Sequence, residues 1–263
     1  MTHPPATRVL LASALSVTAL LAAAGCSVDD EPRPRWFSAS ASASASGASP
    51  AVEQPAGSGA ALTEVQARAA LVTETDLGEP WAPTRGARTW RDGLLKATTE
   101  DRDCQRLLDA LYTEEPFGTP KGPQATSALD DGDTDAQLHY RVAAHPPADV
   151  DRTLDWMESL PGRCGQFTAA TTRGGIQGVE VSDLPLPPAG DARQALRVTL
   201  AGETEEGELT YLTVDLAAVR VGEETITLTN AGLDEVYAEV TQQAVQLGAQ
   251  RLADIRKQGR AQI

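Results

Sequence analysis

Three cysteine side chains are the groups in this sequence best suited to covalent chemistry, because a thiol can be acylated, oxidised to a disulfide or bound to a metal. The first, Cys26, follows one positive charge at Arg8 and an almost purely apolar run from Val9 to Ala24. A helix that spans a bilayer needs about 20 consecutive apolar residues, whereas this run is shorter and is interrupted by hydroxyl side chains. The order of charge, apolar run and small residues therefore predicts an export signal that ends at residue 26.

The residues just before Cys26 resemble the lipobox of bacterial lipoproteins. The small pair Ala24-Gly25 stands directly before the thiol, although Ala23 occupies the position three before it, where leucine is usual. The resemblance implies lipidation at Cys26, which would hold the protein on the extracytoplasmic face of the cell membrane by a nearly permanent lipid anchor. Soluble secretion after an ordinary signal-peptide cut and an uncleaved membrane anchor are the alternatives.

The other two thiols, Cys104 and Cys164, are left for a structural role in an exported domain, where disulfides persist. A bridge between them would close a loop of about 61 residues and stabilise the fold by about 4 kcal/mol in the chain-entropy model. Two buried free thiols are the alternative. A metal site is less expected, because no histidine or further cysteine stands at ligand spacing.

A basic and aromatic cluster, Arg85, Arg88, Trp90 and Arg91, stands out in a chain of net charge −15. Such a cluster could bind an anion or a sugar, and these four residues are the candidate ligand-binding residues. The alternative is a surface loop whose arginines pair with nearby acids. Because the acidic chain would repel nucleic acid, we expect a small-molecule, cell-wall or protein ligand and no nucleic-acid partner.

Motifs for catalysis and for resident metals are missing from the sequence. It has three histidines and no Gly-x-Ser-x-Gly, His-Glu-x-x-His, phosphate-loop or Cys-x-x-Cys pattern. The acidic stretch 130–135 lacks the glycine and the glutamate of a calcium loop, with Ala136 and Val142 in their places, so an Asp-Gly hairpin turn is the simpler prediction. We expect no enzyme activity, no catalytic residues, no cofactor and no metal. A cell-wall hydrolase stays an alternative, because carboxylates can pair in space.

The domain organisation follows from composition and periodicity. We expect a lipoprotein leader over residues 1–26, a flexible linker rich in Ser, Ala, Gly and Pro over 27–60, and an extracytoplasmic domain over 61–263. The domain is predicted to be α+β, an antiparallel sheet with flanking helices that include a long C-terminal one. Predicted helices cover 63–72, 101–112, 148–160 and the region from 234 onward; predicted strands cover 137–144, 166–172, 176–182 and a three-stranded meander from 196 to 228.

Three local expectations sharpen this prediction. In the strand 137–144, Leu138, Tyr140 and Val142 alternate inward and His139 and Arg141 point outward. Pro161-Gly162 is predicted to end the helix that precedes Cys164. A β-bulge is expected at Ala217-Ala218, where the alternation of the meander changes.

The order of several weak motifs resembles the extracellular sensor domain found at the C-terminus of PknH-type actinobacterial kinases and in free-standing lipoproteins. The motifs are Leu77-Gly78 with Trp81, Cys104, Trp156 in a helix that ends at Cys164, Leu184-Pro185, Gly190-Asp191, Arg220-Val221-Gly222 and the closing helix. Together they cover about residues 71–251.

This resemblance implies an actinobacterial α+β sensor-like domain with helices around a cleft and a ligand-sensing role without catalysis. The kinase-attached form has two disulfides, whereas this chain offers one pair. A lipid or glycolipid carrier is the other functional class to consider, and it would need a large apolar cavity.

Overall fold

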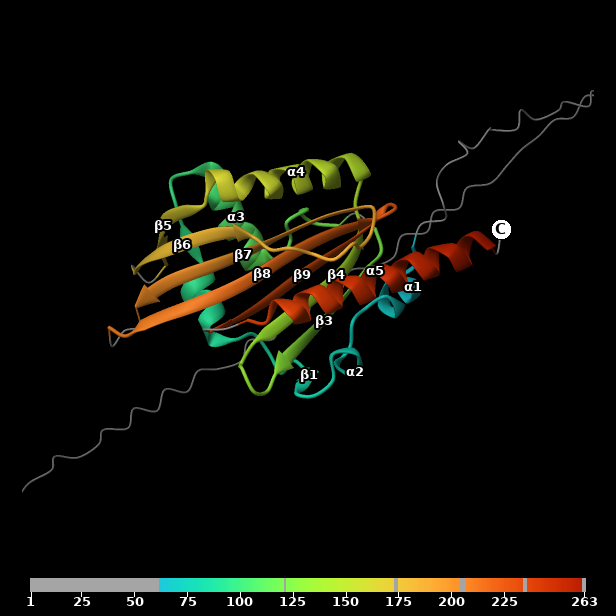
Figure 1. Ribbon diagram of the computed structural model, residues 1–263, viewed down its shortest axis with the longest axis horizontal. Coiled ribbons are helices and arrows are strands. Elements are labelled where there is room, and N and C mark those ends of the chain that lie inside the picture. Colours follow the sequence, from blue (N-terminus) through green and yellow to red (C-terminus); the bar gives the residue numbers. More distant parts are fainter. Residues whose placement is uncertain (1–61, 121, 173–174, 204–206, 234–235, 262–263) are drawn as a thin grey trace, which may run out of the picture. The chain divides into compact units, whose positions relative to one another are not determined.

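The computed structural model describes residues 62–120, 122–172, 175–203, 207–233 and 236–261 (Figure 1). The predicted leader 1–26 with Cys26, and the linker 27–60, lie outside these residues. The described helices are α1 Glu64–Ala69, α2 Glu74–Leu77, the π-helical turn η1 Arg91–Leu95, α3 Arg102–Thr113, α4 Pro147–Arg163 and α5 Ala238–Ala261. The strands are β1 Trp81–Pro83, β2 Ala97–Thr98, β3 Gln124–Asp131, β4 Gln137–Ala144, β5 Gln166–Thr171, β6 Ile176–Asp183, β7 Ala192–Glu203, β8 Leu209–Val221 and β9 Glu224–Leu233.

The strands form one antiparallel sheet in the order β1-β3-β4-β9-β8-β7-β6-β5-β2. Strands β5 to β9 follow one another as a meander, and the β3–β4 hairpin joins it beside β9. In the turn of that hairpin the Asp131 carboxylate accepts from the backbone N–H groups of Asp133 and Thr134 at 2.8 and 3.2 Å. The predicted α+β class, the antiparallel sheet and the hairpin turn are therefore confirmed.

Two helical layers cover opposite faces of the sheet (Figure 1). On what we call the disulfide face, α3 and α4 pack over β6 to β8, where Leu196, Leu200 and Leu216 are fully buried. On the α5 face, α1 and α5 pack over β3, β4, β9 and β8, where Leu138 and Ile226 are fully buried. Alternate residues of each central strand therefore belong to different cores, since successive side chains of a strand point to opposite faces.

Burial on both faces explains why the predicted bulge is wrong. Ala217 and Ala218 are both fully buried, and they pair in unbroken register with Leu228 and Thr227 of β9. The change in alternation therefore marks a strand that is buried on both faces. Such a strand does not alternate between apolar and polar residues, and no inserted bulge residue is needed to explain the pattern.

The predicted end of α4 at Pro161-Gly162 is also wrong. The helix continues to Arg163, and the backbone N–H of Cys164 donates to the Leu160 carbonyl at 2.7 Å. A proline in the last turn removes only its own N–H from the hydrogen-bond ladder, and Leu160 is fully buried against the core. The packing of this turn therefore outweighs the local signal of Pro161.

The helix starts were predicted more closely. The Thr63 side chain and the Gln66 side chain form the capping box of α1, and Asp101 caps α3. α5 begins at Ala238, after the predicted start at 234, and buries Ala244, Val245 and Leu252 on one side. None of the described helices is both long and apolar enough to cross a membrane.

Candidate ligand-binding site

A polar cavity of about 140 Å³ lies on the disulfide face, over β3, β4 and β9 and beside the end of α3. The residues that line it include Glu114, Thr126, Ala128, His139, Arg141, Thr227 and Thr229. The sheet register explains this grouping. His139 pairs with Thr229, and Arg141 pairs with Thr227 on one side and Thr126 on the other. Residues that pair across an antiparallel sheet share a face, so three strands contribute polar side chains to one place.

Glu114 enters the wall of this cavity from the end of α3. It caps the helix in the left-handed conformation, with φ of 58°, and so turns the chain away from the helix axis. One carboxylate oxygen accepts from the Arg91 guanidinium, and the other lies 3.0 Å from His139 Nδ1. The Arg91 guanidinium also donates to the Tyr112 carbonyl at 2.5 Å. A half-buried carboxylate is thus placed between two cationic or potentially cationic groups.

The electrostatics of Glu114 reflect this position. Burial alone would raise the pKa of its carboxyl, but the hydrogen bond and the charge of His139, followed by those of Arg91, bring the pKa below its ordinary value. Glu114 is therefore ionised at neutral pH.

His139 is held from both sides. Its Nδ1 faces Glu114, and its Nε2 lies 2.8 Å from Oε1 of Gln137. Gln137 is itself 1% exposed, and its Nε2 lies within 3.0 Å of the Thr84 hydroxyl, the Gly86 carbonyl and the Asp130 carboxylate. This chain of contacts fixes both the ring and the amide.

Two threonine side chains of β9, Thr227 and Thr229, face the cavity. Thr227 and Thr229 are 5% and 4% exposed and line the cavity, yet neither side chain makes a hydrogen bond to the part of the chain that the structure describes. The Thr126 hydroxyl, on the same face of β3, is unpartnered in the same sense. These hydroxyls are therefore open to whatever occupies the cavity.

The structure separates the four residues of the predicted basic cluster. Arg91 reaches the cavity wall through Glu114, whereas Arg88 pairs with Asp135 at 3.1 Å and with Asp130 at 3.8 Å. Trp90 is half-buried against the core of the disulfide face, and Arg85 is exposed. Arg88 and Arg91 thus show the acid pairing that was the alternative interpretation, and ligand binding by this cluster stays a prediction.

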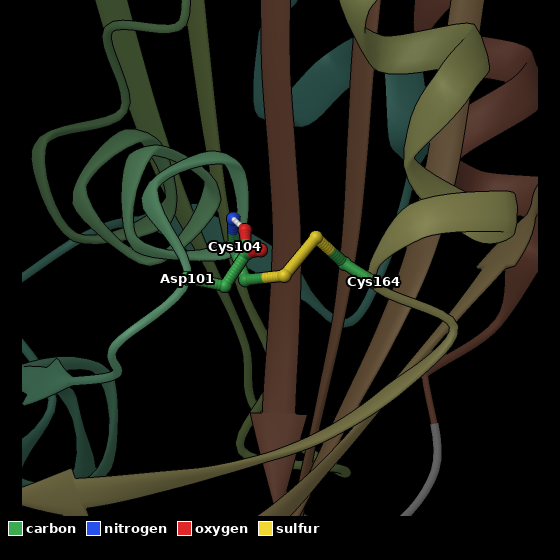
Figure 2. A group of neighbouring side chains, drawn as sticks. All are labelled: Asp101, Cys104 and Cys164. Carbon is green, nitrogen blue, oxygen red and sulfur yellow. Dashed lines mark hydrogen bonds between the residues drawn. A yellow bond between two sulfur atoms is a disulfide. The ribbon is translucent and has the colours of Figure 1, made fainter.

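Cys104 and Cys164 form the predicted disulfide, which joins the first turn of α3 to the end of α4 (Figure 2). Asp101 lies close enough for the three side chains to suggest a metal-binding group. However, the two sulfur atoms are bonded to each other, and one Asp101 carboxylate oxygen accepts from the backbone N–H groups of Asp103 and Cys104 at 2.9 and 3.1 Å. These residues therefore act as a covalent link and a helix cap.

Comparison with solved structures returns the extracellular domain of PknH from Mycobacterium tuberculosis. It shares 18% identity and a TM-score of 0.47, over 74% of this chain and 97% of that domain. An uncharacterised protein from Rhizobium leguminosarum is more distant, with 12% identity and a TM-score of 0.25 over 52% of this chain and 99% of the other. No protein-family model and no curated protein matched the sequence.

The sequence interpretation missed the residues that form the cavity. It placed His139 and Arg141 together on the outward side of one strand but gave them no partner. The signal that could have found the rest is the alternation Thr225, Thr227, Thr229 in β9, a row of hydroxyls facing the same way. Which strand pairs with β4 is set by tertiary structure, so the meeting of these two rows was not visible in the sequence.

Proposed function

We propose that this chain is a lipid-anchored, extracytoplasmic binding module that takes a small polar ligand without transforming it. The observation that carries the proposal is the pair Thr227 and Thr229, whose hydroxyls face one cavity and have no hydrogen-bond partner among the described residues. Small-ligand sites combine a pre-formed hollow with a few fixed polar groups. Here the sheet fixes the threonines, and the contacts of Glu114 and Gln137 fix His139.

The absence of catalysis is supported by how the ionisable groups are used. A general base needs a nitrogen or oxygen that can reach a substrate proton. Both ring nitrogens of His139 face protein acceptors, and both oxygens of Glu114 face protein cations. The polar lining also favours a polar ligand over an acyl chain, which argues for a sensor-like role over a lipid or glycolipid carrier.

The location outside the cytoplasm rests on two features. The Cys104–Cys164 bridge is of a kind that persists in oxidising compartments, and the residues around Cys26 resemble a lipobox. Replacing Cys26 with Ser in the full chain is expected to release the protein from the membranes of an expressing actinobacterium. Unchanged membrane retention, or a mature N-terminus without added acyl mass, would contradict the anchor.

The binding role is tested on the full chain in detergent micelles, with threonine methyl groups labelled for NMR. A panel of small polyols, carboxylates, oxyanions and amino acids is expected to contain a compound that shifts the Thr227 and Thr229 methyl signals. The double variant Thr227→Val/Thr229→Val keeps the shape but removes both hydroxyls, and it should weaken that compound at least tenfold, or about 1.4 kcal/mol. Thr199→Val, on the opposite face of β7, is the matched control. Unchanged binding by the double variant would refute the site.

A further inference from the structure

Within the proposed binding role, on which this inference rests, we infer that the ligand of the cavity is a small anion, a carboxylate or an inorganic oxyanion, and that His139 serves it as a fixed imidazolium cation. The inference comes from hydrogen-bond direction, the charges around the ring, the free donors and the size of the cavity.

The amide of Gln137 has only one possible orientation. Its Nε2 lies 2.8 Å from the Asp130 carboxylate and 3.0 Å from the Gly86 carbonyl, and both of these oxygens can only accept. Burial would raise the pKa of Asp130, but hydrogen bonds from Gln137, Thr84 and the Arg85 backbone lower it below its ordinary value, so this carboxylate is ionised. The NH₂ group of Gln137 must therefore face these acceptors, and its Oε1 must face His139.

Both nitrogens of His139 must consequently carry hydrogen. Nε2 lies 2.8 Å from the Gln137 carbonyl oxygen, and Nδ1 lies 3.0 Å from the ionised Glu114 carboxylate. A neutral imidazole has one donor and one acceptor, whereas the imidazolium has two donors. Rotating the ring by 180° would instead turn its carbons Cδ2 and Cε1 toward these acceptors, so the orientation with both nitrogens facing them is the one that satisfies the hydrogen bonds. The surroundings of His139 thus select the cation.

The groups around the imidazolium leave it only partly neutralised. Glu114 is shared between His139 and Arg91, so these three groups sum to one positive charge. Arg141, two residues along the same strand face, pairs with Glu115 at 2.6 Å and adds none. On the far side of Gln137, Asp130 faces Arg88, whose guanidinium also pairs with Asp135. The groups at the cavity wall thus sum to one positive charge, and the group of Arg88, Asp130 and Asp135 behind Gln137 sums to one negative charge.

The free hydrogen-bonding groups suit an anion of limited size. The hydroxyls of Thr227, Thr229 and Thr126 can all donate, and Arg141 donates to Glu115 through Nη1 alone, which leaves other N–H groups beside the cavity. The cavity of about 140 Å³ has room for a small anion such as acetate, lactate or phosphate.

The protonation of His139 can be measured directly with ¹⁵N-histidine in the full chain, which contains three histidines. His139 is expected to give two protonated ring nitrogens at pH 7, and His139→Asn identifies its signals. His145 is the internal reference, because burial and the charge of Arg141 lower its pKa, so it should be neutral under the same conditions. A single neutral tautomer at His139 would overturn the inference.

The ligand class is tested by titrating the full chain with acetate, lactate, phosphate and the neutral triol glycerol, following the Thr227 and Thr229 methyl signals. At least one anion should bind tenfold or more tightly than glycerol. The comparison of lactate with phosphate separates a carboxylate site from an oxyanion site.

Two charge variants sharpen the test. Glu114→Gln removes the ionised acceptor that selects the imidazolium and should weaken the preference for anions, whereas His139→Gln should abolish it. Glu180→Gln, exposed on β6 and on the opposite face, is the control for net charge. Binding of glycerol without anion preference would leave the proposed binding role standing and overturn this inference. Failure of every compound to bind would overturn both.

Discussion

The two faces of the central sheet are stabilised in different ways. The disulfide face is held by an apolar core under α3 and α4 and by the covalent bond from Cys104 to Cys164. The α5 face has an apolar core of its own, but charged contacts fix its helices: Arg251 binds Asp76 of α2, and Arg256 binds Glu224 at the start of β9. Reduction should therefore lower the stability of the disulfide face, and a change of pH should lower the stability of the α5 face, although both faces share the same strands.

The position of the candidate site follows from this difference. The cavity lies on the disulfide face, but over β3, β4 and β9, where α3 ends at Glu114 and α4 packs instead over β6 and β7. The same strands are covered by α1 and α5 on their other side. Helices packed on the α5 face thus hold the strands in place where the disulfide face carries unpartnered polar groups. This arrangement suits a pre-formed binding site.

The largest effect is expected from removing the covalent bond of the disulfide face. The double variant Cys104→Ala/Cys164→Ala should lose about 4 kcal/mol of unfolding free energy, because the bridge closes a loop of 60 residues. Chemical denaturation measures the loss, and hydrogen exchange locates it. Amides of α3 and α4 should lose protection more than those of α5. Equal loss of amide protection on both faces would show that the two cores unfold together, and it would contradict the view that the two faces are stabilised separately.

The second effect tests how closely α5 approaches the sheet. Gly248 faces Tyr140 of β4, and a Cβ atom at this position would lie 1.7 Å from the tyrosine oxygen. The Tyr140 hydroxyl is itself buried without a hydrogen-bond partner in the described residues, so it has little room to move. Gly248→Ala should cost about 3 kcal/mol of unfolding free energy through overpacking.

A matched control for this substitution comes from the other helical layer. Gly162 of α4 has open space where its Cβ would stand, so Gly162→Ala should be neutral or stabilise by up to about 1 kcal/mol. Thermal denaturation of both variants, with hydrogen exchange as above, compares the faces. Equal effects from the two alanines would refute the close contact between α5 and Tyr140.

The sequence predicted helices and strands correctly where a single local interaction determines the residue pattern. The capping box at Thr63, the helix after Asp101 and the alternation around Tyr140 each depend on local hydrogen bonds or on burial of one face, and all are confirmed. The errors at Ala217-Ala218 and Pro161 arose where tertiary packing outweighed the local signal.

The candidate site was less predictable for a physical reason. Its parts come from the end of α3 and from three strands that are distant in sequence, and nothing in β4 alone reveals that β9 lies beside it. Arg91 was predicted to bind a ligand, but its guanidinium forms an ion pair with Glu114. The sequence can show that a charged side chain is unusual, whereas only the fold shows which partner it has.

The smallest change in the free energy of unfolding is expected from the charged contact between α2 and α5. The Arg251 guanidinium donates to both oxygens of Asp76, which is 12% exposed, and also to the Leu71 carbonyl. The hydrogen bond from Arg251 is the main reason that the pKa of Asp76 falls from 3.8 to about 2. A carboxyl group with a lowered pKa in the folded state stabilises the fold above its unfolded pKa, and this contribution disappears as pH falls toward 2.

Asp76→Asn should therefore lower the unfolding free energy by about 1–2 kcal/mol at pH 7 and by almost nothing near pH 2, because the wild-type carboxyl is then losing its charge. Urea denaturation at a series of pH values measures the difference. Glu64→Gln is the control: its pair with Arg68 is exposed by two thirds on both sides, and such pairs contribute little. Repeating the series on the reduced protein separates the faces, since the loss from Asp76→Asn should be unchanged if the α5 face is stabilised independently of the disulfide. A loss that vanishes on reduction would mean that the charged contact depends on the covalent one.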